Sequence, residues 1–166
     1  MDGALAVLPV RDETVIRLVL PGIPTAWQRD GRRIITPKDK TKKQFVSTYT
    51  HTETRNRQAD LRQDAYDQMA GRAPFTGPID LRYGAFMPVP PSWSNAKRRR
   101  AMADEIRPTT RPDFDNLMKM VDALKGIVWV DDTQATDVFF WKRYTDRPRV
   151  VIEIRPINLS QQGILT

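Results

Sequence analysis

The chain has 166 residues, of which 40% are hydrophobic and 28% are charged, and its formal net charge at pH 7 is +7. This composition is typical of a single globular domain, and its basic balance favours nucleic acid or an anionic membrane surface as partner. The chain has no cysteine, which excludes disulfides, zinc–thiolate sites and cysteine nucleophiles.

The beginning of the chain has no basic region before its short apolar run, so it does not resemble a secretory leader. No stretch approaches the ~20 apolar residues of a membrane span. We therefore expect a cytoplasmic protein outside the membrane. We also expect one domain over residues 1–166, with a core at about 14–156 and flexible ends.

The first half of the chain predicts a strand, a loop and a long helix. Residues 14–20 are rich in β-branched residues and precede Pro21-Gly22, so they indicate a strand. A loop with a short strand at 33–36 is expected over residues 21–38, and residues 29–43 hold seven bases against two acids. Residues 40–70 contain no glycine or proline, and the spacing of their later apolar residues indicates a helix. The polar middle of this segment leaves an interruption of the helix open.

The second half predicts a strand at 78–87, a basic helix with Ser94 as its cap, and a helix at 114–125 that ends at Gly126. Strands follow at 136–144 and 148–155. In the last strand, one face carries the apolar residues of an alternating pattern: Val150, Ile152 and Ile154. This order of elements predicts an α/β fold, mixed α+β, with helices packed on a single sheet.

Acidic residues gather around the helix at 114–125. One face of this helix is apolar and carries Leu117, Met120, Val121 and Leu124. The opposite face carries Asp115, Lys119 and Asp122, so these side chains project into solvent or a groove. Each acid alone has an ordinary explanation, such as a helix cap, an ion pair four residues apart or a turn.

Together the acids indicate a metal site. Residues 113–137 hold six acids and two lysines, a net charge of −4 in a basic chain. Carboxylates about 4 Å apart repel each other by roughly 4 kcal/mol at an effective dielectric constant of 20, and a divalent cation removes that repulsion. Ligands that are all oxygen favour Mg²⁺ or Mn²⁺ over zinc.

Two other kinds of site fit poorly. The run at 113–116 begins like a calcium-binding EF-hand loop, but Met118 stands where glycine is needed and Leu124 where a bidentate glutamate is needed. The single histidine, His51, lies in a polar run, and we do not expect it to build a serine–histidine–aspartate site.

These residues resemble the RusA family of Holliday junction resolvases. The matching pattern is P-D-x-D-N-L-x-K at 112–119, D-A-L at 122–124 and D-D-x-Q at 131–134. Lys142, the closing strand and the segment MPVPPSWSNAKRRRA are also similar to the family. A looser likeness extends over residues 14–155.

The resemblance implies a homodimeric, Mg²⁺-dependent endodeoxyribonuclease that nicks four-way DNA junctions symmetrically in recombination and repair. The host would be a bacterial or phage-infected cell. By this resemblance Asp113, Asp115 and Asp132 bind the metal, and Lys119 is catalytic. The sequence leaves open whether Asp131 replaces Asp132 as ligand, and we expect Mn²⁺ to substitute for Mg²⁺.

Basic residues are expected to hold the DNA backbone: Lys97, Arg98, Arg99, Arg100 and Arg111. The four consecutive bases span a full helical turn, so they cannot share one face, and a charged solubilising helix is the alternative. Trp27 and Trp93 either contact unstacked bases or pack within the protein.

The strands at 136–155 are expected to contribute to the dimer interface, through Phe139 or Phe140 and Trp141. Two other functions stay open at this point: a basic DNA-binding protein without catalysis, and a Mg²⁺ nuclease that acts on other branched DNA.

Overall fold

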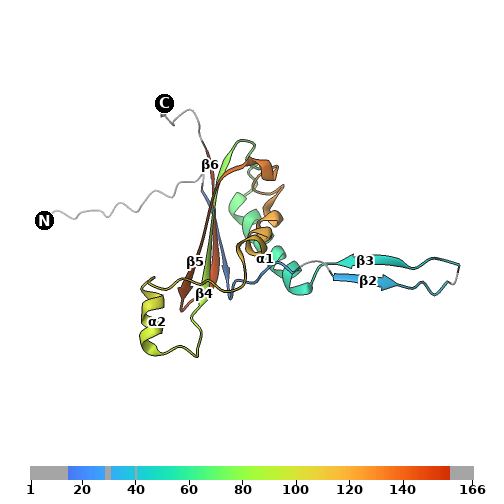
Figure 1. The fold of residues 1–166 in the computed structure, drawn as a ribbon. Coiled ribbons are helices and arrows are strands. Elements are labelled where there is room, and N and C mark those ends of the chain that lie inside the picture. Colours follow the sequence, from blue (N-terminus) through green and yellow to red (C-terminus); the bar gives the residue numbers. More distant parts are fainter. Residues whose placement is uncertain (1–14, 29–30, 40, 158–166) are drawn as a thin grey trace.

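A computed structural model describes residues 15–28, 31–39 and 41–157 of the chain. Its centre is a four-stranded mixed sheet in the order β1-β6-β4-β5 (Figure 1). The strands are β1 (Ile16–Pro21), β4 (Ile79–Pro88), β5 (Ala135–Thr145) and β6 (Arg149–Pro156). β6 pairs antiparallel with both β1 and β4, whereas β4 and β5 are parallel. The four strands predicted for this core are confirmed, with small shifts of their ends.

One face of the sheet forms the hydrophobic core. Ile16, Leu18 and Leu20 of β1 alternate with exposed residues. The apolar face predicted for the last strand is confirmed, because Val150, Ile152 and Ile154 are buried there. Burying such side chains is the main favourable contribution to folding, at about 25 cal/mol per Å² of apolar surface.

Helices cover that face (Figure 1). They are α1 (Thr52–Met69), α3 (Phe114–Met118) and the 3₁₀ helix η1 (Lys119–Leu124), while α2 (Asn95–Met102) lies at one end of the sheet beside β5. The long α1 packs on β1 and η1. It buries three apolar residues at helical spacing: Leu61, Ala65 and Met69. No helix in the described part of the chain has the length and apolar character needed to cross a membrane.

The helix expected over residues 40–70 is wrong in its first part. α1 begins only at Thr52, and residues 45–49 form β3 (Phe45–Tyr49), which pairs antiparallel with β2 (Gly31–Ile35). The run FVSTY is rich in β-branched and aromatic residues, which favour strands. The two strands form a second sheet, so the expectation of a single sheet is corrected as well.

The helix expected at 114–125 divides in two. Its α-helical part ends at Met118, and the 3₁₀ helix η1 continues to Leu124. The predicted apolar stripe is nevertheless buried throughout: Leu117, Met120, Val121 and Leu124. The tighter winding over the six residues of η1 keeps residues three apart on the same face, so the stripe still meets the core. The flexible ends expected at both termini lie outside the described residues.

Candidate active site

An aspartate cap fixes the start of α3. The Asp113 Oδ1 atom accepts a hydrogen bond from the backbone N–H of Asn116 at 3.0 Å. Lys142 of β5 holds the preceding residues, because its Nζ donates to the carbonyl oxygens of Thr110 and Pro112 at 2.6 and 2.9 Å. Burial lowers the pKa of Lys142, and the charge of Asp113 acts in the opposite direction. The cap of α3 is therefore tied to the central sheet.

An open pocket of about 370 Å³ lies along α3 and η1. Its charged lining residues come from two separate segments of the chain: Asp115, Lys119, Asp122 and Asp132. Lys119 bonds to the carboxylate of Asp115 one helical turn away. Three carboxylates and one ammonium give this lining a net charge of −2. The acidic stripe predicted from the sequence thus shares one surface with Asp132.

The excess negative charge of this pocket is visible at Asp122. Partial burial raises the pKa of its carboxyl, and the nearby carboxylate of Asp132 raises it further, against Lys119 and Lys125. Lys125 lies closer to the aspartate doublet, with its Nζ 2.8 Å from Asp131 and 3.5 Å from Asp132. Burial is the larger cause of this rise, and the charge of Asp132 adds a repulsion that a bound cation would relieve.

The two residues of the aspartate doublet do different things. Asp131 caps the 3₁₀ helix η2 (Asp132–Gln134). Its bond from Lys125, followed by bonds from the N–H and hydroxyl of Thr133, lowers the pKa of Asp131 to about 2. Asp132 instead lines the acidic pocket, and its Oδ1 accepts a bond from the indole N–H of buried Trp129 at 3.0 Å. Asp131 is thus occupied by its own turn, while Asp132 faces the pocket.

Gln134 clamps this doublet to the segment before β4. Its Oε1 accepts from the N–H groups of Val130 and Asp131 at 2.8 and 2.7 Å. Its Nε2 donates to the carbonyl oxygens of Phe75 and Gly77, both at 2.8 Å. All four hydrogen-bonding positions of the amide are used. We call this arrangement the Gln134 clamp.

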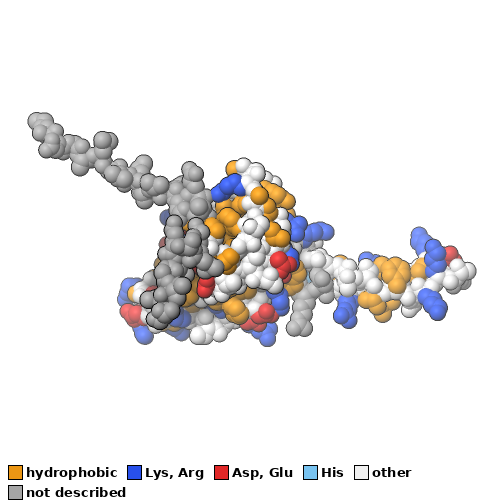
Figure 2. Space-filling model, turned by 90° about the horizontal axis from the view of Figure 1, so that it is seen from above, with side chains coloured by type: hydrophobic (Ala, Val, Ile, Leu, Met, Phe, Trp, Pro, Cys, Tyr) orange, Lys and Arg blue, Asp and Glu red, His pale blue; other side chains and the backbone are white. Residues whose placement is uncertain are grey.

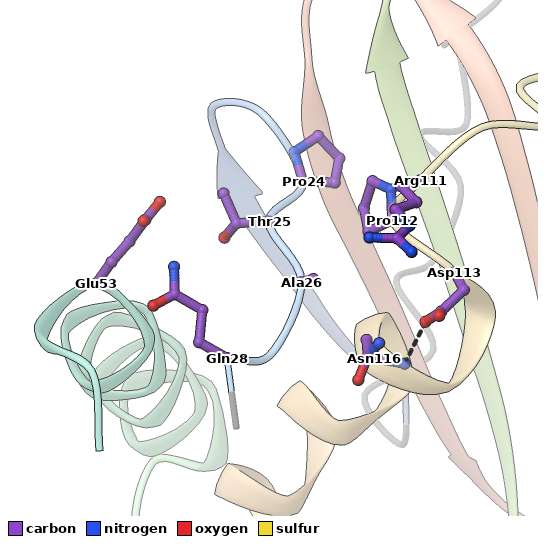
Figure 3. Close-up of a pocket in the computed structure, with 9 residues that line it drawn as sticks. All are labelled: Pro24, Thr25, Ala26, Gln28, Glu53, Arg111, Pro112, Asp113 and Asn116. Carbon is purple, nitrogen blue, oxygen red and sulfur yellow. Dashed lines mark hydrogen bonds between the residues drawn. The ribbon is translucent and has the colours of Figure 1, made fainter. Parts of the chain in front are cut away.

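A second open pocket, of about 680 Å³, contains Asp113 (Figure 3). The loop after β1, the first turn of α1 and the start of α3 meet around it. Its polar lining residues are Thr25, Gln28, Glu53, Arg111, Asp113 and Asn116. Asp113 and Asp115 therefore line different pockets, although only Phe114 separates them in the sequence.

The structure brings the predicted metal ligands together only in part. Asp115 and Asp132 share the acidic pocket, and Asp113 lies in its neighbour. Within residues 15–28, 31–39 and 41–157, no three His, Cys, Asp or Glu side chains form a group that could hold a metal ion. Each of the three predicted ligands accepts a hydrogen bond from a group of the protein itself.

The bases expected to bind DNA lie in two places. Arg111 lines the Asp113 pocket. The other four belong to α2, where three already have contacts within the protein. The Lys97 ammonium lies 3.9 Å from the Trp93 ring centroid, Arg98 donates to a backbone carbonyl at 3.3 Å, and Arg100 pairs with Glu105 at 3.0 Å. Arg99 is exposed in the last turn of α2.

The aromatic residues divide between packing and exposure. Trp93 packs edge-on against Tyr144, with ring centroids 5.1 Å apart, and Trp27 is partly buried. Both tryptophans therefore fit the alternative in which they pack within the protein. Phe140 is partly buried, stacks on Tyr83 at 5.6 Å and packs against the core. Of the two phenylalanines considered for the dimer interface, only Phe139 is exposed, with 61% of its surface accessible.

Sequence reasoning missed several residues that line the two pockets. Gln28 and Glu53 come from segments far from the acidic motif, and no local pattern points to them. Asn116 stands inside the D-x-D-N motif, and Asp122 stands on the predicted acidic stripe, so both had a signal in the sequence. They were not assigned a role because spacing alone does not show which pocket a side chain reaches.

Comparison with known proteins identifies the family. The model of the endodeoxyribonuclease RusA family matches residues 23–155, which include both pockets. The chain belongs to the RusA endodeoxyribonuclease family. A similar protein, the uncharacterized YqaN of Bacillus subtilis (strain 168), is 40% identical to this RusA-family chain over 86 residues, or 50% of the chain. The match spans 61% of the length of that relative.

Proposed function

We propose that this RusA-family protein is a Mg²⁺-dependent endonuclease that resolves four-way DNA junctions by paired hydrolysis of phosphodiester bonds. The observation that carries the proposal is the acidic pocket on a chain of net charge +7. In a protein that only bound DNA, a pocket of charge −2 would lower the affinity for DNA, because the pocket repels phosphate. A divalent cation turns the same pocket into a phosphate-binding site.

The pocket fits Mg²⁺ by its donor chemistry. Its carboxylates are hard oxygen ligands, and its net charge matches that of a divalent cation. We propose Asp115 and Asp132 as ligands in this pocket and, from the resemblance of the D-x-D-N motif, Asp113 of the neighbouring pocket as a third ligand. We expect Mn²⁺ to replace Mg²⁺. The chemistry that such an ion supplies is activation of water and neutralisation of phosphate charge.

The protein's own residues would complete the site. Lys119 lies one helical turn from Asp115, where its ammonium can stabilise the charge that develops on phosphate during hydrolysis. Trp129 orients Asp132 through its indole N–H. Lys142 keeps the chain before Asp113 in place, so it is a positioning residue.

Symmetric cleavage needs two sites in one complex. A homodimer with a two-fold axis supplies them through a single self-complementary interface. We propose that the sheet face carrying Phe139 forms this interface, since that face has a large exposed aromatic side chain. Bases outside the acidic pocket, including Arg99 and Arg111, would hold the DNA backbone.

The proposal is tested by cleavage of a labelled four-way junction and of a matched linear duplex, each in Mg²⁺ and in EDTA. We expect paired nicks in the junction only, and only with Mg²⁺. Binding without cleavage in either Mg²⁺ or Mn²⁺ would leave a DNA-binding protein and refute the enzyme. A parallel assay on flap and fork DNA tests the choice of substrate. Preferential cleavage of flaps or forks would refute the four-way junction as the substrate.

Asp115→Asn provides the matched variant for this experiment. It removes a carboxylate charge from the acidic pocket while keeping the side-chain size, so we expect loss of cleavage with junction binding retained. Asp60→Asn, on an exposed position of α1, makes the same change outside both pockets and should cut at the wild-type rate. Equal activity of the two variants would contradict the proposed role of the pocket.

A further inference from the structure

A two-stranded ribbon projects from the body of the protein (Figures 1 and 2). We call residues 31–39 and 41–49 the arm; it comprises β2, β3 and the described residues of the turn between them. The cross-strand partners run from Gly31 with Tyr49 to Ile35 with Phe45. Side chains of directly opposite residues share a face of the ribbon, so both faces can be assigned from this register.

Both faces of the arm expose apolar side chains. Ile34 and Val46 are cross-strand partners on one face, with 68% and 61% of their surfaces accessible. Phe45 and Tyr49 lie on the other face and are 54% and 51% accessible. A two-stranded hairpin alone is marginally stable in water, and exposed apolar pairs on such an element indicate a binding surface.

The charge of the arm selects the partner. Its described residues include one acid, Asp39, and five bases: Arg32, Arg33, Lys38, Lys42 and Lys43. Asp39 serves the turn, because its Oδ1 accepts bonds from the N–H and hydroxyl of Thr41 at 3.0 and 2.7 Å. None of the five bases forms an ion pair within the described residues, whereas many bases of the body, such as Arg82, do so. The arm thus presents a net charge of +4 to a polyanion.

The root of the arm is built into the Asp113 pocket. The backbone N–H of Trp27 donates to the carbonyl oxygen of Asn116 at 2.8 Å, which joins the segment before the arm to α3. Thr25 and Gln28 before the arm, and Glu53 after it, line that pocket (Figure 3). A partner held along the arm therefore lies next to the site that carries Asp113.

A glycine fixes the ribbon at this root. A Cβ added to Gly31 would lie 2.3 Å from the Tyr49 ring, so the ring covers the glycine directly. Covering a strand glycine with an aromatic ring from the partner strand is a known way to stabilise a two-stranded pair. The Tyr49 ring also contacts His51, with ring centroids 5.6 Å apart, at the start of α1. This contact connects the ribbon to the body.

We propose that the arm binds a duplex segment of the DNA substrate by lying in a groove, with its bases on the phosphates and its apolar pairs against the groove wall. The major groove, about 12 Å wide, admits a two-stranded ribbon. Nine residues from Gly31 to Asp39, at about 3.3 Å each, reach at most about 30 Å, close to one helical turn of DNA. The inference rests on the proposed function only in taking DNA as the substrate.

The test measures binding of the full chain to a labelled junction in EDTA, at several salt concentrations, so that it does not depend on cleavage. The variant Lys38→Ala/Lys42→Ala/Lys43→Ala removes three charges from the turn end of the arm. We expect at least a tenfold higher Kd and a salt slope that is less steep by about 2 to 3, since each phosphate contact contributes about 0.9.

The matched control is Lys38→Arg/Lys42→Arg/Lys43→Arg, which keeps the charges and should bind like the wild type. The substitutions Ile34→Thr and Val46→Thr replace the apolar cross-strand pair of the arm. Each should weaken binding without changing the salt slope, because neither changes a charge. Unchanged Kd and salt slope in the alanine variant would overturn the proposal. A second result would also overturn it: light scattering without DNA that shows a dimeric wild type and a monomeric alanine variant. The partner of the arm would then be a second copy of the chain.

The same measurements separate the two proposals. A wild type that binds the junction but never cuts it, with the alanine variant binding weakly, refutes the nuclease and supports the arm. A wild type that cuts in Mg²⁺, with the alanine variant equal in binding and salt slope, supports the nuclease and refutes the arm.

Discussion

At the scale of single residues, a substitution of Lys119 distinguishes a catalytic site from an ordinary charged helix surface. Its bond to Asp115 alone would contribute only a few tenths of a kcal/mol, because such surface pairs are solvated. We expect Lys119→Gln to lower the cleavage rate by about 100-fold or more. In other enzymes, loss of one group that stabilises charge in the transition state has an effect of this size. Single-turnover cleavage measures this rate, and unchanged turnover would show that Lys119 only pairs with Asp115.

The aspartate doublet gives a second test at this scale. Asp132 faces the acidic pocket, whereas Asp131 is held by Thr133 and Lys125. We therefore expect Asp132→Asn to abolish Mg²⁺-dependent cleavage with little change in melting temperature. Asp131→Asn keeps an oxygen that can cap the turn but loses the ion pair with Lys125, so it should lower the melting temperature slightly and keep most of the activity. The opposite pattern would make Asp131 the ligand.

The sequence predicted that Asp115, Lys119 and Asp122 share one helix face, because their spacing in the chain is short, and all three line one pocket. The sequence could not show whether Asp131 or Asp132 is the ligand. Side chains of adjacent residues point in different directions, and the conformation of the turn decides which one faces the pocket. The sequence also could not find Gln28 and Glu53, which reach the Asp113 pocket from other elements. Their position depends on packing between α1 and the loop after β1, which no local spacing encodes.

At the scale of elements, β-branched composition before Pro21-Gly22 predicted the first core strand, and alternation predicted the last one, because burial of one sheet face has a period of two residues. The absence of glycine and proline over residues 40–70 was a poor guide, since it permits strand as well as helix. The pairing of β3 with β2 depends on residues 10 or more positions apart, such as Ile34 and Val46. The apolar stripe from Leu117 to Leu124 was compatible with both an α and a 3₁₀ helix, so it did not show where the winding changes.

The pairing of β4 and β5 supplies a test of element packing. A Cβ at Gly84 of β4 would lie 2.6 Å from the Trp141 ring of β5, so the ring covers this glycine. We expect Gly84→Ala to displace Trp141, to cost about 1 kcal/mol or more of stability, and to change tryptophan fluorescence. Thermal unfolding measures the first effect. Gly77→Ala meets open space and should leave both properties unchanged.

At the scale of the whole molecule, the two faces of the sheet differ. The helices cover one face, while the other carries a polar network in which Arg17 and Arg155 both contact Glu153, at 3.1 and 3.3 Å. On β5, which β4 separates from β6, the rings of Phe139 and Trp141 lie 5.5 Å apart. An exposed aromatic side chain next to paired charges is typical of a protein interface with an apolar centre and a polar rim.

The proposed dimer gives the prediction that belongs to this scale. We expect Phe139→Glu to convert a dimer into a monomer, as measured by light scattering, and to replace paired nicks with single, slower nicks. Tyr66→Glu makes the same kind of change on the exposed surface of α1 and should leave the dimer intact. A Phe139→Glu variant that remains dimeric would place the interface elsewhere.

The Gln134 clamp has a further consequence for local opening of the fold. Besides its four bonds, the backbone N–H of Phe75 donates to Val128 at 2.8 Å, and that of Val130 donates to Phe75 at 3.3 Å. We therefore expect the loop that carries Asp132 and the segment before β4 to open as one cooperative unit. Amide hydrogens of Phe75, Val130 and Asp131 should exchange with solvent deuterium at a common protection free energy, and Gln134→Ala should lower it for all three together.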